Sequence, residues 1–594
     1  MDPLAEYTAR RDRFRAGEQL LGKQFIRIGN WRLAIAVLAA ALAWLVFGRR
    51  SVTPWSLLFP VGAFVALVVW HQRVIRQRTM ASRAQAFYER GLARLRDEWI
   101  GTGITGERFR DASHVYAEDL DLFGKGGLFE LIATTRTAAG EDTLAGWLLH
   151  PAAREQVLSR QPAVEELRPK LDLREDIALL AQDVRSDVNV SKLDRWGSAP
   201  VVKLPGVLRP LAMLLAVSGI AALIAFFAHA IPLWPLLAIL GCDFAIIFAF
   251  RSKVSSILES VEGSGRDLKV FSALVERLDA EQFTSPKLRE LREALTIAGE
   301  PVSKRVRQLE RLIDWFDSSD HVLVRVLRPL LLWQEQLAIS FENWRARSGP
   351  HIGSWVHAVA EFEALSSFAA LAFERPDWTT PQLLATETAT FDAIGLRHPL
   401  IPASVCVVND LALDTERPML VVSGSNMSGK STLLRAVGLN GVLAWAGAPV
   451  AATALSVSPL AIGASIRVND SLQDHRSRFF AEITKIRQIV DLTKSGKPVL
   501  FLLDELLSGT NSHDRRMGAS GIVKELLRAN AIGLITTHDL ALANIQQDVR
   551  EGVANVHFED QMNGTEMLFD YKLKPGVVTR SNAIELMRAV GLEV

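Results

Sequence analysis

Residues 424–431 fill every fixed position of the phosphate-binding P-loop pattern, Gly-x-x-x-x-Gly-Lys-Ser. The apolar run Pro418–Val422 leads into them, and the helix-forming run Thr432–Val437 follows. The glycines allow the backbone to curl until consecutive N–H groups face phosphate oxygens, next to the positive end of a helix. A strand, a glycine-rich loop and a helix in this order predict an α/β P-loop domain that binds a nucleoside triphosphate.

The polar residues of this loop have distinct expected roles. The Lys430 ammonium reaches the β- and γ-phosphates, and the Ser431 hydroxyl joins the ligand shell of a Mg²⁺ ion. The residues that we expect to bind the nucleotide are Gly424, Ser425, Asn426, Met427, Ser428, Gly429, Lys430, Ser431 and Thr432.

Two later apolar runs end in residues that complete such a site. The run 499–503 is typical of a buried strand and leads into Asp504 and Glu505, and the run 532–537 leads into His538. An Asp at such a strand end holds Mg²⁺ through water, and the adjacent Glu polarises the attacking water. A single His after a strand is more often incidental, but here it follows a P-loop and an Asp-Glu pair in order. The predicted metal ligands are Ser431 and Asp504, and the predicted catalytic residues are Glu505 and His538.

Composition narrows the possible classes of protein. At 594 residues the chain is long enough for about four domains. The net charge of +1 provides no bulk attraction to nucleic acid. The two cysteines, Cys242 and Cys406, have neither the spacing of a metal site nor the number of a disulfide framework.

Four apolar runs, arranged as two pairs, are the second strong feature of the sequence. A short turn joins the two runs of each pair, and a spanning helix needs about 20 apolar residues. We expect two transmembrane helical hairpins; four buried core helices or two re-entrant hairpins are the alternatives. The first 30 residues are of mixed charge and helix-like, so we expect no cleavable signal. The four runs are Leu33–Gly48, Ser51–Trp70, Pro210–Ala228 and Ala230–Phe250.

Basic residues around these runs predict the orientation of the hairpins. They gather at one end of both hairpins, whereas the opposite turns carry only Arg49 and Arg50 and, in the second turn, no full charge. The positive-inside rule then places both termini and all large segments in the cytoplasm of a multi-pass protein of the inner (cytoplasmic) membrane. The basic residues are Arg10, Arg11, Arg13, Arg15, Lys23, Arg27, Arg73, Arg76, Arg78, Arg83, Arg251 and Lys253.

One carboxylate interrupts the apolar runs. Asp243 lies eight residues before Arg251. An ionisable residue within a membrane helix is a candidate functional group, but the simpler expectation is a position near a protein-packed or hydrated helix end. Because His229 in the opposite turn is the one other ionisable residue of these runs, the sequence does not predict a proton or ion path.

Helical periodicity predicts packed helices between the second hairpin and the P-loop domain. Apolar residues recur at helical spacing in two stripes, which we interpret as core faces and not as ligand sites. Pro376 and the Thr-rich stretch that ends at Thr390 are typical of a linker. The stripes consist of Leu268, Val270, Phe271, Leu274, Val275 and Leu278, and of Val306, Leu309, Leu312, Ile313 and Phe316.

Further motifs follow one another in a family-specific order. They are Arg397–Pro399, Asn409–Asp410, Ser477–Glu482, Asp504–Asp514, Thr536–His538, Tyr571–Gly576, Ile584–Glu585 and Gly591–Leu592. Together with the Asn-Met-containing P-loop, they resemble the ATPase domain of the MutS family of DNA mismatch-repair proteins. Weaker matches at Leu128–Leu131, Leu144–Pro151 and Gln161–Leu167 resemble the start of the family's helical core domain.

The resemblance implies an activity and a partner. Members act as dimers whose ATPase domains face each other, so we expect an ATP hydrolase that uses ATP and Mg²⁺. A homodimer would close on ATP and reopen after hydrolysis, which is a two-state element biased by one phosphate. The resemblance also implies that Ser508, in the signature loop 508–512, acts in trans on the γ-phosphate bound by the other subunit, and that His557 contacts the nucleotide.

The expected organisation has six segments. They are an N-terminal cytoplasmic helix (1–30), transmembrane hairpin 1 (31–70), a helical region resembling the MutS core (71–207), transmembrane hairpin 2 (208–250), a helical lever region (251–390) and the MutS-type P-loop ATPase domain (391–594).

Several features separate the chain from the mismatch-repair members. Nothing corresponds to their N-terminal mismatch-reading domain, and Leu507 and Ser508 stand where members carry a Gly-Arg pair. Residues 251–375, the expected place of a DNA clamp, hold 17 Lys and Arg against 18 Asp and Glu. This balance lacks the basic stripe that phosphate contacts favour.

Three functions therefore stay open. The first is a membrane-anchored dimeric ATPase that binds mismatched or branched DNA in a repair-related role. The second is an ATPase that uses the same dimer cycle on a membrane partner without nucleic acid. The third is a transporter, which is least supported because four short spans and one Asp243 offer little for a pathway.

Overall fold

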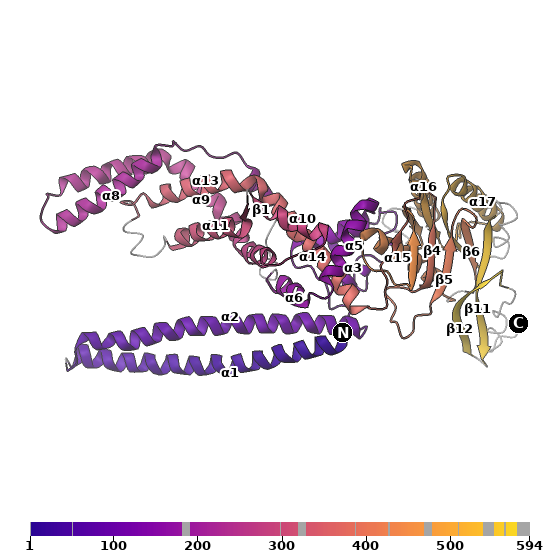
Figure 1. The fold of residues 1–594 in the computed structure, drawn as a ribbon, viewed down its shortest axis with the longest axis horizontal. Coiled ribbons are helices and arrows are strands. Elements are labelled where there is room, and N and C mark those ends of the chain that lie inside the picture. Colours follow the sequence, from indigo (N-terminus) through magenta and orange to yellow (C-terminus); the bar gives the residue numbers. More distant parts are fainter. Residues whose placement is uncertain are drawn as a thin grey trace.

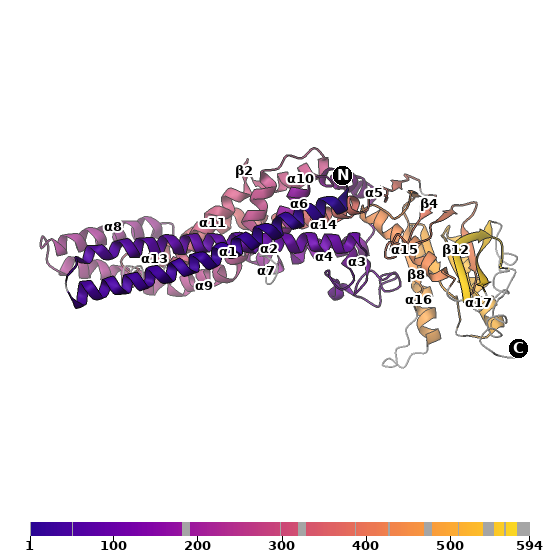
Figure 2. The same cartoon turned by 90° about the horizontal axis from the view of Figure 1, so that it is seen from below.

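The computed structural model describes residues 2–49, 51–180, 190–297, 299–318, 328–386, 388–425, 428–467, 478–508, 510–538, 552–563 and 566–578. The chain has three parts, namely two helical hairpins, a helical middle region and a C-terminal α/β region (Figure 1). Both hairpins leave the middle region in the same direction, and the α/β region lies at the opposite end of the molecule. The perpendicular view agrees (Figure 2).

Hairpin 1 consists of two long helices. Helix α1 (Pro3–Ala43) continues into the π-helical turn η1 (Trp44–Gly48), and α2 (Leu58–Leu95) follows the 3₁₀ turn η2 (Pro54–Leu57). The Asp2 side chain caps α1 by accepting a hydrogen bond from the Leu4 N–H. No helix ends near residue 30 or residue 70. The predicted boundaries there fall inside continuous helices, because no proline or glycine pair interrupts the sequence at either point.

Hairpin 2 also extends beyond its predicted limits. It consists of α8 (Leu208–Phe227) and α9 (Trp234–Asp279), a helix of 46 residues that passes residue 250 without a break. The inner part of α9 buries Phe271, Leu274, Val275 and Leu278, which confirms this part of the first predicted core stripe. Leu268 and Val270 of the same stripe have side chains outside the description.

The outer ends of the hairpins are apolar and exposed. By length and composition the two helices of each hairpin qualify as candidate membrane spans, and at most 22% of each apolar window is buried within the protein. Large side chains such as Phe59, Phe227 and Trp234 are exposed there. A fifth candidate span, Trp333–Glu374, is 94% buried, so its helices belong to the protein core.

The middle region packs around helix α14. Of the second predicted stripe, Val306, Leu309 and Ile313 are buried in α11, and Leu312 and Phe316 are partly buried. Every residue of α14 from Val359 to Glu374 is buried, so this helix is the axis of the core. The region is less helical than predicted between residues 97 and 127, where turns and one 3₁₀ turn, η3 (Glu107–Phe109), replace helix. Its helices are α3 (Leu128–Ile132), α4 (Ala138–Leu149), α5 (Arg154–Leu167), α6 (Leu171–Leu180), α7 (Val190–Ser198), α10 (Pro286–Ala294), α11 (Val302–Asp317), α13 (Trp333–Ser348) and α14 (Ile352–Glu374), and a short β-ladder pairs β1 (Thr296–Ile297) with β2 (Glu300–Pro301).

A buried ion pair fixes the base of hairpin 1 to the end of α14. The Arg94 guanidinium donates two hydrogen bonds to the Glu374 carboxylate, at 2.6 and 2.5 Å, and both side chains are less than 10% exposed. The Tyr7 hydroxyl donates a third bond to Glu374, at 3.2 Å. Two-pronged Arg–carboxylate contacts are geometrically specific, so the base of hairpin 1 has one defined position on the core.

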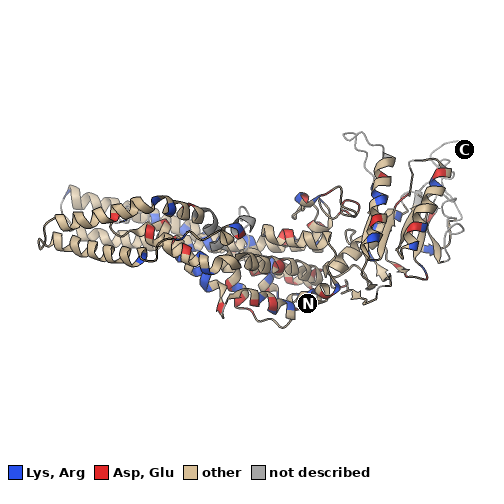
Figure 3. Ribbon diagram, turned by 90° about the horizontal axis from the view of Figure 1, so that it is seen from above, with Lys and Arg blue, Asp and Glu red and all other residues tan. Residues whose placement is uncertain are grey.

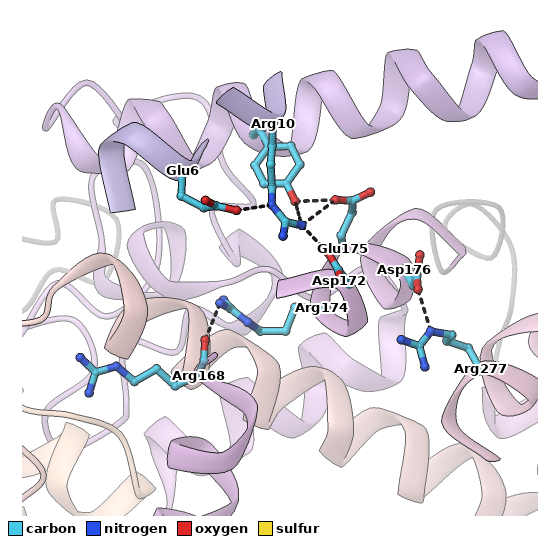
Figure 4. Close-up of polar contacts among 9 residues, drawn as sticks. Glu6, Arg10, Arg168, Asp172, Arg174, Glu175, Asp176 and Arg277 are labelled. Carbon is cyan, nitrogen blue, oxygen red and sulfur yellow. Dashed lines mark hydrogen bonds and ion pairs between the residues drawn. The ribbon is translucent and has the colours of Figure 1, made fainter. Parts of the chain in front are cut away.

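Helix α6 contacts both hairpins through polar side chains (Figure 4). Arg10 of α1 donates to Asp172 at 2.6 Å and lies 3.5 Å from Glu175. On another side of α6, Arg277 of α9 donates to Asp176 at 2.6 Å. This short helix therefore connects the two hairpins at their bases.

The α/β region contains two sheets. The larger has the order β12-β11-β6-β10-β9-β8; its strands from β11 to β8 are parallel, and β12 is antiparallel to β11. The smaller has the order β3-β7-β4-β5, so the predicted linker after Pro376 contributes a strand to it. The strands are β3 (Gln382–Leu383), β4 (Phe391–Leu396), β5 (Asn409–Leu413), β6 (Met419–Ser423), β7 (Ala454–Val457), β8 (Ala461–Ser465), β9 (Val499–Leu503), β10 (Ile532–Thr537), β11 (Val553–Asn563) and β12 (Glu566–Pro575), and the helices are α15 (Lys430–Ala446), α16 (Arg478–Leu492), the 3₁₀ turn η7 (Thr493–Ser495) and α17 (Ser512–Arg528).

An irregular segment of the middle region is embedded in the α/β region. The buried Asp119 carboxylate accepts hydrogen bonds from the backbone N–H groups of Ile466 and Arg467, at 2.7 and 2.8 Å, and forms an ion pair with Lys485. The next residue, Leu120, is fully buried, and a Cβ added at Gly438 of α15 would lie 2.6 Å from it. The middle and α/β regions consequently share one hydrophobic core.

Candidate nucleotide-binding site

The predicted site residues meet at one edge of the larger sheet. In the parallel strands β6 and β10, Ser423 is opposite Thr537, and in β9 and β10, Leu503 is opposite Ile535. The residues that follow these strands therefore emerge side by side, as is usual for ligand sites at the carboxyl ends of parallel strands. This register brings the P-loop, the Asp504–Glu505 pair and His538 together.

The backbone of the P-loop needs its two glycines. Gly424 has a φ of 152° and Gly429 a φ of 101°, values that side chains disfavour. A Cβ at Gly424 would lie 2.7 Å from the Ser428 Oγ. The hydroxyls of Ser425 and Ser428 are buried without a hydrogen-bond partner, so the loop presents unused polar atoms of the kind that a phosphate satisfies. Asn426 and Met427 lie outside the described residues.

Lys430 begins α15 and turns back over the loop. Its Nζ donates to the carbonyl oxygens of Gly424, at 2.9 Å, and Ser425, at 2.7 Å. Burial lowers the pKa of Lys430, while the nearby carboxylates of Glu505 and Asp504 act in the opposite direction. The ammonium group is thus held at the mouth of the loop, where it can exchange carbonyl oxygens for phosphate oxygens.

The predicted metal ligands line a cavity that opens beside the P-loop. Ser431, Thr432 and Asp504 are all among its walls. The Asp504 carboxylate accepts a hydrogen bond from the Thr536 hydroxyl, and the same hydroxyl oxygen accepts a bond from the Glu505 N–H, at 3.0 Å. A hydroxyl beside an oriented carboxylate is the donor set that Mg²⁺ takes in P-loop sites, so these residues fit the ion.

The predicted catalytic pair is in direct contact. His538 Nδ1 lies 3.1 Å from Glu505 Oε1, and both side chains are partly exposed. Glu505 also lines the cavity beside the P-loop. Glu505 has a φ of 47° and Leu507 a φ of 57°, a left-handed backbone that is rare outside glycine. Strained backbone of this kind concentrates at functional sites, and here it aims a carboxylate at the space above the P-loop.

Hydrogen bonds from Arg515 hold the signature loop 508–512 in place. Arg515 donates hydrogen bonds to the carbonyl oxygens of Leu507, Ser508 and Thr510, each at 3.1 Å. Asn511 caps α17 by accepting a bond from the Asp514 N–H. Ser508 lines the cavity of its own chain; its action in trans stays a prediction. Gly509 lies outside the described residues.

A cavity of about 710 Å³ opens beside the P-loop, a volume in the range of small-molecule sites. Its polar wall includes Lys430, Ser431, Asp504, Glu505 and Ser508. Its apolar wall includes Leu396, Ile401 and Val405. Burial lowers the pKa of His398 in this wall to about 4, with Arg435 acting in the same direction, so the ring is neutral at pH 7. One polar and one apolar wall match the phosphates and the base of a nucleotide.

Tyr571 is the site residue that sequence reasoning missed. In the sequence it was only part of the motif 571–576. In the structure its ring lies 3.2 Å from a Cβ built at Gly429, and it lines the cavity. Its backbone is left-handed, with a φ of 51°, and its carbonyl oxygen accepts a hydrogen bond from Asn409 Nδ2 at 3.0 Å. An aromatic residue that close to the P-loop provides a stacking surface.

His557 lies on β11, beside the start of the P-loop, and its contact with the nucleotide stays a prediction. It pairs with Ser423 across β11 and β6, and its Nδ1 lies 3.0 Å from the Gly576 carbonyl oxygen. Because side chains alternate along a strand, it is the next residue, Phe558, that lines the cavity. Among the described residues around the cavity, His557 is not present.

Other predictions can be compared with the described residues. Cys242 and Cys406 are both free thiols in the structure. Within the described residues no cluster of three or more His, Cys, Asp or Glu side chains suggests a separate metal site. Ser477, Ile584–Glu585 and Gly591–Leu592 of the family-specific motifs lie outside the description.

Comparison with known proteins agrees with this geometry. Residues 420–593 match the family model described as MutS domain V. The matched range includes the P-loop, Asp504, Glu505 and His538, and domain V is the ATPase domain of that family. The C-terminal region of this chain is therefore similar to MutS domain V, which supports membership of the MutS family.

Proposed function

We propose that this protein is a membrane-anchored ATPase of the MutS type that hydrolyses ATP and transmits the state of its nucleotide site to hairpin 2. The observation that carries the proposal is the continuous helical path between these two sites. Helix α13 begins against α8 and α9, runs through η6 (Gly349–His351) into α14, and α14 ends at Glu374 just before the α/β region.

The chemistry follows from the residues around the cavity. Backbone N–H groups of the loop and the Lys430 ammonium hold the phosphates, and Ser431 with Asp504 holds Mg²⁺. Bound Mg²⁺ supplies positive charge against the phosphate oxygens. Glu505 accepts a proton from the attacking water, and His538, at 3.1 Å from it, orients this carboxylate and reports on the γ-phosphate.

The base of the nucleotide is proposed to rest on Tyr571. This side chain is 42% exposed and borders both the P-loop and the apolar wall. Stacking on an aromatic ring adds roughly 0.5–1.5 kcal/mol beyond area burial. His557, which was predicted from the family resemblance, is not needed for this arrangement.

The membrane assignment rests on the exposed apolar ends of both hairpins. These ends are nearly free of Lys, Arg, Asp and Glu, whereas charged residues are frequent on the middle and α/β regions (Figure 3). Both hairpins point the same way, so a single bilayer accommodates the two of them. We propose an inner-membrane location with the ATPase in the cytoplasm, as the positive-inside rule predicts.

A homodimer completes the proposal. In the family the ATPase domains face each other, and we propose that Ser508 of one subunit reaches the γ-phosphate held by the other. ATP then closes the dimer and hydrolysis reopens it, and α14 carries the movement to α13 and hairpin 2.

Two experiments test the ATPase and the anchor separately. The detergent-solubilised protein is expected to hydrolyse ATP in a Mg²⁺-dependent reaction, with Lys430→Ala as the inactive control. The protein in cells is expected to stay with the membrane fraction after alkaline washing and to leave it only in detergent. Full-length, folded protein that neither binds nor hydrolyses ATP contradicts the first half, and protein that is soluble without detergent contradicts the second.

DNA binding is the second candidate function, and the match to MutS domain V is the observation that favours it. The near-equal numbers of basic and acidic residues in 251–375 weaken it. Retention of the purified protein on mismatched or branched DNA at low salt, lost when surface arginines are reversed in charge, supports a repair-related role. Absence of retention at low salt favours action on a membrane partner without nucleic acid.

A further inference from the structure

Asp243 occupies an unusual position in hairpin 2. It lies on α9 about 12 Å, or eight residues, from Arg251 at the inner end of the apolar run. The residue is only 1% exposed, and neither carboxylate oxygen has a hydrogen-bond partner in the structure. Of the two surroundings that the sequence left open, protein-packed or hydrated, the structure shows the first: Asp243 is enclosed by protein.

A second carboxylate reaches this place from outside the apolar runs. Glu335, in the first turn of α13, is 3% exposed and lies close enough to Asp243 for their charges to interact. Burial raises the pKa of Glu335, Arg328 opposes this increase, and Asp243 adds to it. The sequence alone did not reveal this neighbour, because 92 positions separate the two residues and only the packing of α13 on α9 brings them together.

The surroundings of the pair are apolar. Leu330, just before α13, packs with Ala222 of α8 and Leu236 of α9, and it would contact a Cβ at Gly219. Helix α8 has no ionisable side chain after Arg209. Arg328, before α13, also acts on Glu335, and the last turn of α11, a helix that packs on α9, carries Asp314 and Asp317.

We propose that Asp243, with Glu335 beside it, is a buried proton-binding site in hairpin 2. An ionised carboxylate without a partner costs several kcal/mol in such surroundings, and a second carboxylate nearby increases the cost. A metal cation fits this site less well than a proton. A cation needs about six oxygen ligands, and the described residues offer no cluster of three or more acidic or metal-binding side chains here. A single proton satisfies Asp243.

The site has a direct mechanical consequence. Release of the proton leaves two negative charges between α9 and α13, and their repulsion separates the two helices. Because α13 continues through η6 into α14, the protonation state bears on the same helical path that the ATPase uses.

Infrared spectroscopy of the full-length protein in lipid nanodiscs tests the site directly. At pH 7 the wild type is expected to show the carbonyl stretch of a protonated carboxylic acid, and Asp243→Asn is expected to remove one carboxyl equivalent of this band. Asp142→Asn is the matched control, because the Asp142 side chain is 57% exposed and is expected to leave the band unchanged. Glu335→Gln removes the neighbouring charge, so the band of Asp243 is expected to persist and to disappear at lower pH than in the wild type.

Two results overturn the proposal. One is a band that Asp243→Asn leaves intact in protein that still unfolds at the wild-type temperature. The other is loss of the band when Na⁺ or Ca²⁺ is added at constant pH, which identifies a cation site. If Asp243→Asn does not fold, the pH titration of the band in Glu335→Gln is used instead. A titration midpoint equal to that of the wild type would also overturn the proposal. Because the band does not depend on ATP hydrolysis, failure of the proposed function and failure of this site are distinguishable.

Discussion

Each of the two hairpins contains two candidate membrane spans, but the hairpins differ in how they join the rest of the protein. Hairpin 1 packs mainly on itself and is fixed at its base by charged groups, above all the Arg94–Glu374 pair. Hairpin 2 has apolar packing against α11 and α13 along its inner part. A polar contact at one end holds an element in place, whereas packing along a helix transmits its displacement. Hairpin 1 is thus suited to anchoring and hairpin 2 to movement.

The largest expected effect concerns turnover. Glu505→Gln removes the proposed base, so ATP hydrolysis is expected to fall by about 10²–10⁴-fold while ATP binding persists. In this ATP-bound state, hydrogen exchange is expected to change in α9 and α13 and to stay constant in α1 and α2. Equal changes in both hairpins would show that they do not differ as anchor and moving part.

Lys430→Ala is expected to lower ATP hydrolysis by about 10²–10³-fold, because it removes the ammonium that holds the phosphates. It is also expected to abolish the exchange difference between the hairpins when ATP is added. Lys494→Ala, which alters an exposed lysine of the same region, is the control. ATP-dependent changes that survive in Lys430→Ala would mean that nucleotide acts at another site.

Glu374→Ala tests the attachment of hairpin 1 to the end of α14. Breaking one side of a buried ion pair is expected to cost about 3–5 kcal/mol, and hydrogen exchange at the base of α1 and α2 should accelerate accordingly. Glu18→Ala breaks the partly exposed pair with Arg78 within the same hairpin and is expected to cost less than about 1 kcal/mol. Similar losses of stability in the two variants would refute a special role of the contacts at the base of hairpin 1.

A pH effect is expected in α14, which lies between the two attachments. Burial raises the pKa of Glu363 from 4.5 to about 7. The folded state holds this proton more tightly than the unfolded state, so the stabilisation is full below pH 4.5 and is lost as the pH rises to about 7, in total about 3 kcal/mol. Thermal unfolding should show this slope in the wild type and in the exposed control Glu290→Gln, but not in Glu363→Gln.

Arg277→Ala is expected to have the smallest effect. It removes the partly exposed contact of α9 with Asp176 on α6, at a cost below about 1 kcal/mol. Stability should hardly change, but the distance between spin labels on the two hairpins is expected to become more broadly distributed. An unchanged distribution would show that α6 does not connect their motions.

Local motifs made most of the nucleotide site predictable. Lys430, Asp504 and His538 each follow a strand that is recognisable from its own sequence, and parallel strands always bring such ends to one edge. Tyr571 was not predictable as a site residue, because its position depends on how β12 folds back over β6 through an intervening strand. His557 lies on that intervening strand, β11, and its contact with the nucleotide stays a prediction.

The hairpins were predictable in number but not in length or attachment. Hydropathy reports only the apolar part of a helix, so α1 and α9 continue far into charged sequence without a signal of their end. Contacts between residues far apart in sequence, such as Arg94 with Glu374, have no pattern in a single chain. They arise only after the helices have packed.

The placement of Asp119 and Leu120 limits how this protein can be divided. A fragment that begins at residue 391 would lack Leu120, which packs against Gly438, and Asp119, which forms the ion pair with Lys485. Such a fragment would expose the apolar surface that Leu120 covers, and it is expected to aggregate. A shortened version with an intact core therefore has to include residues 115–124 together with the α/β region.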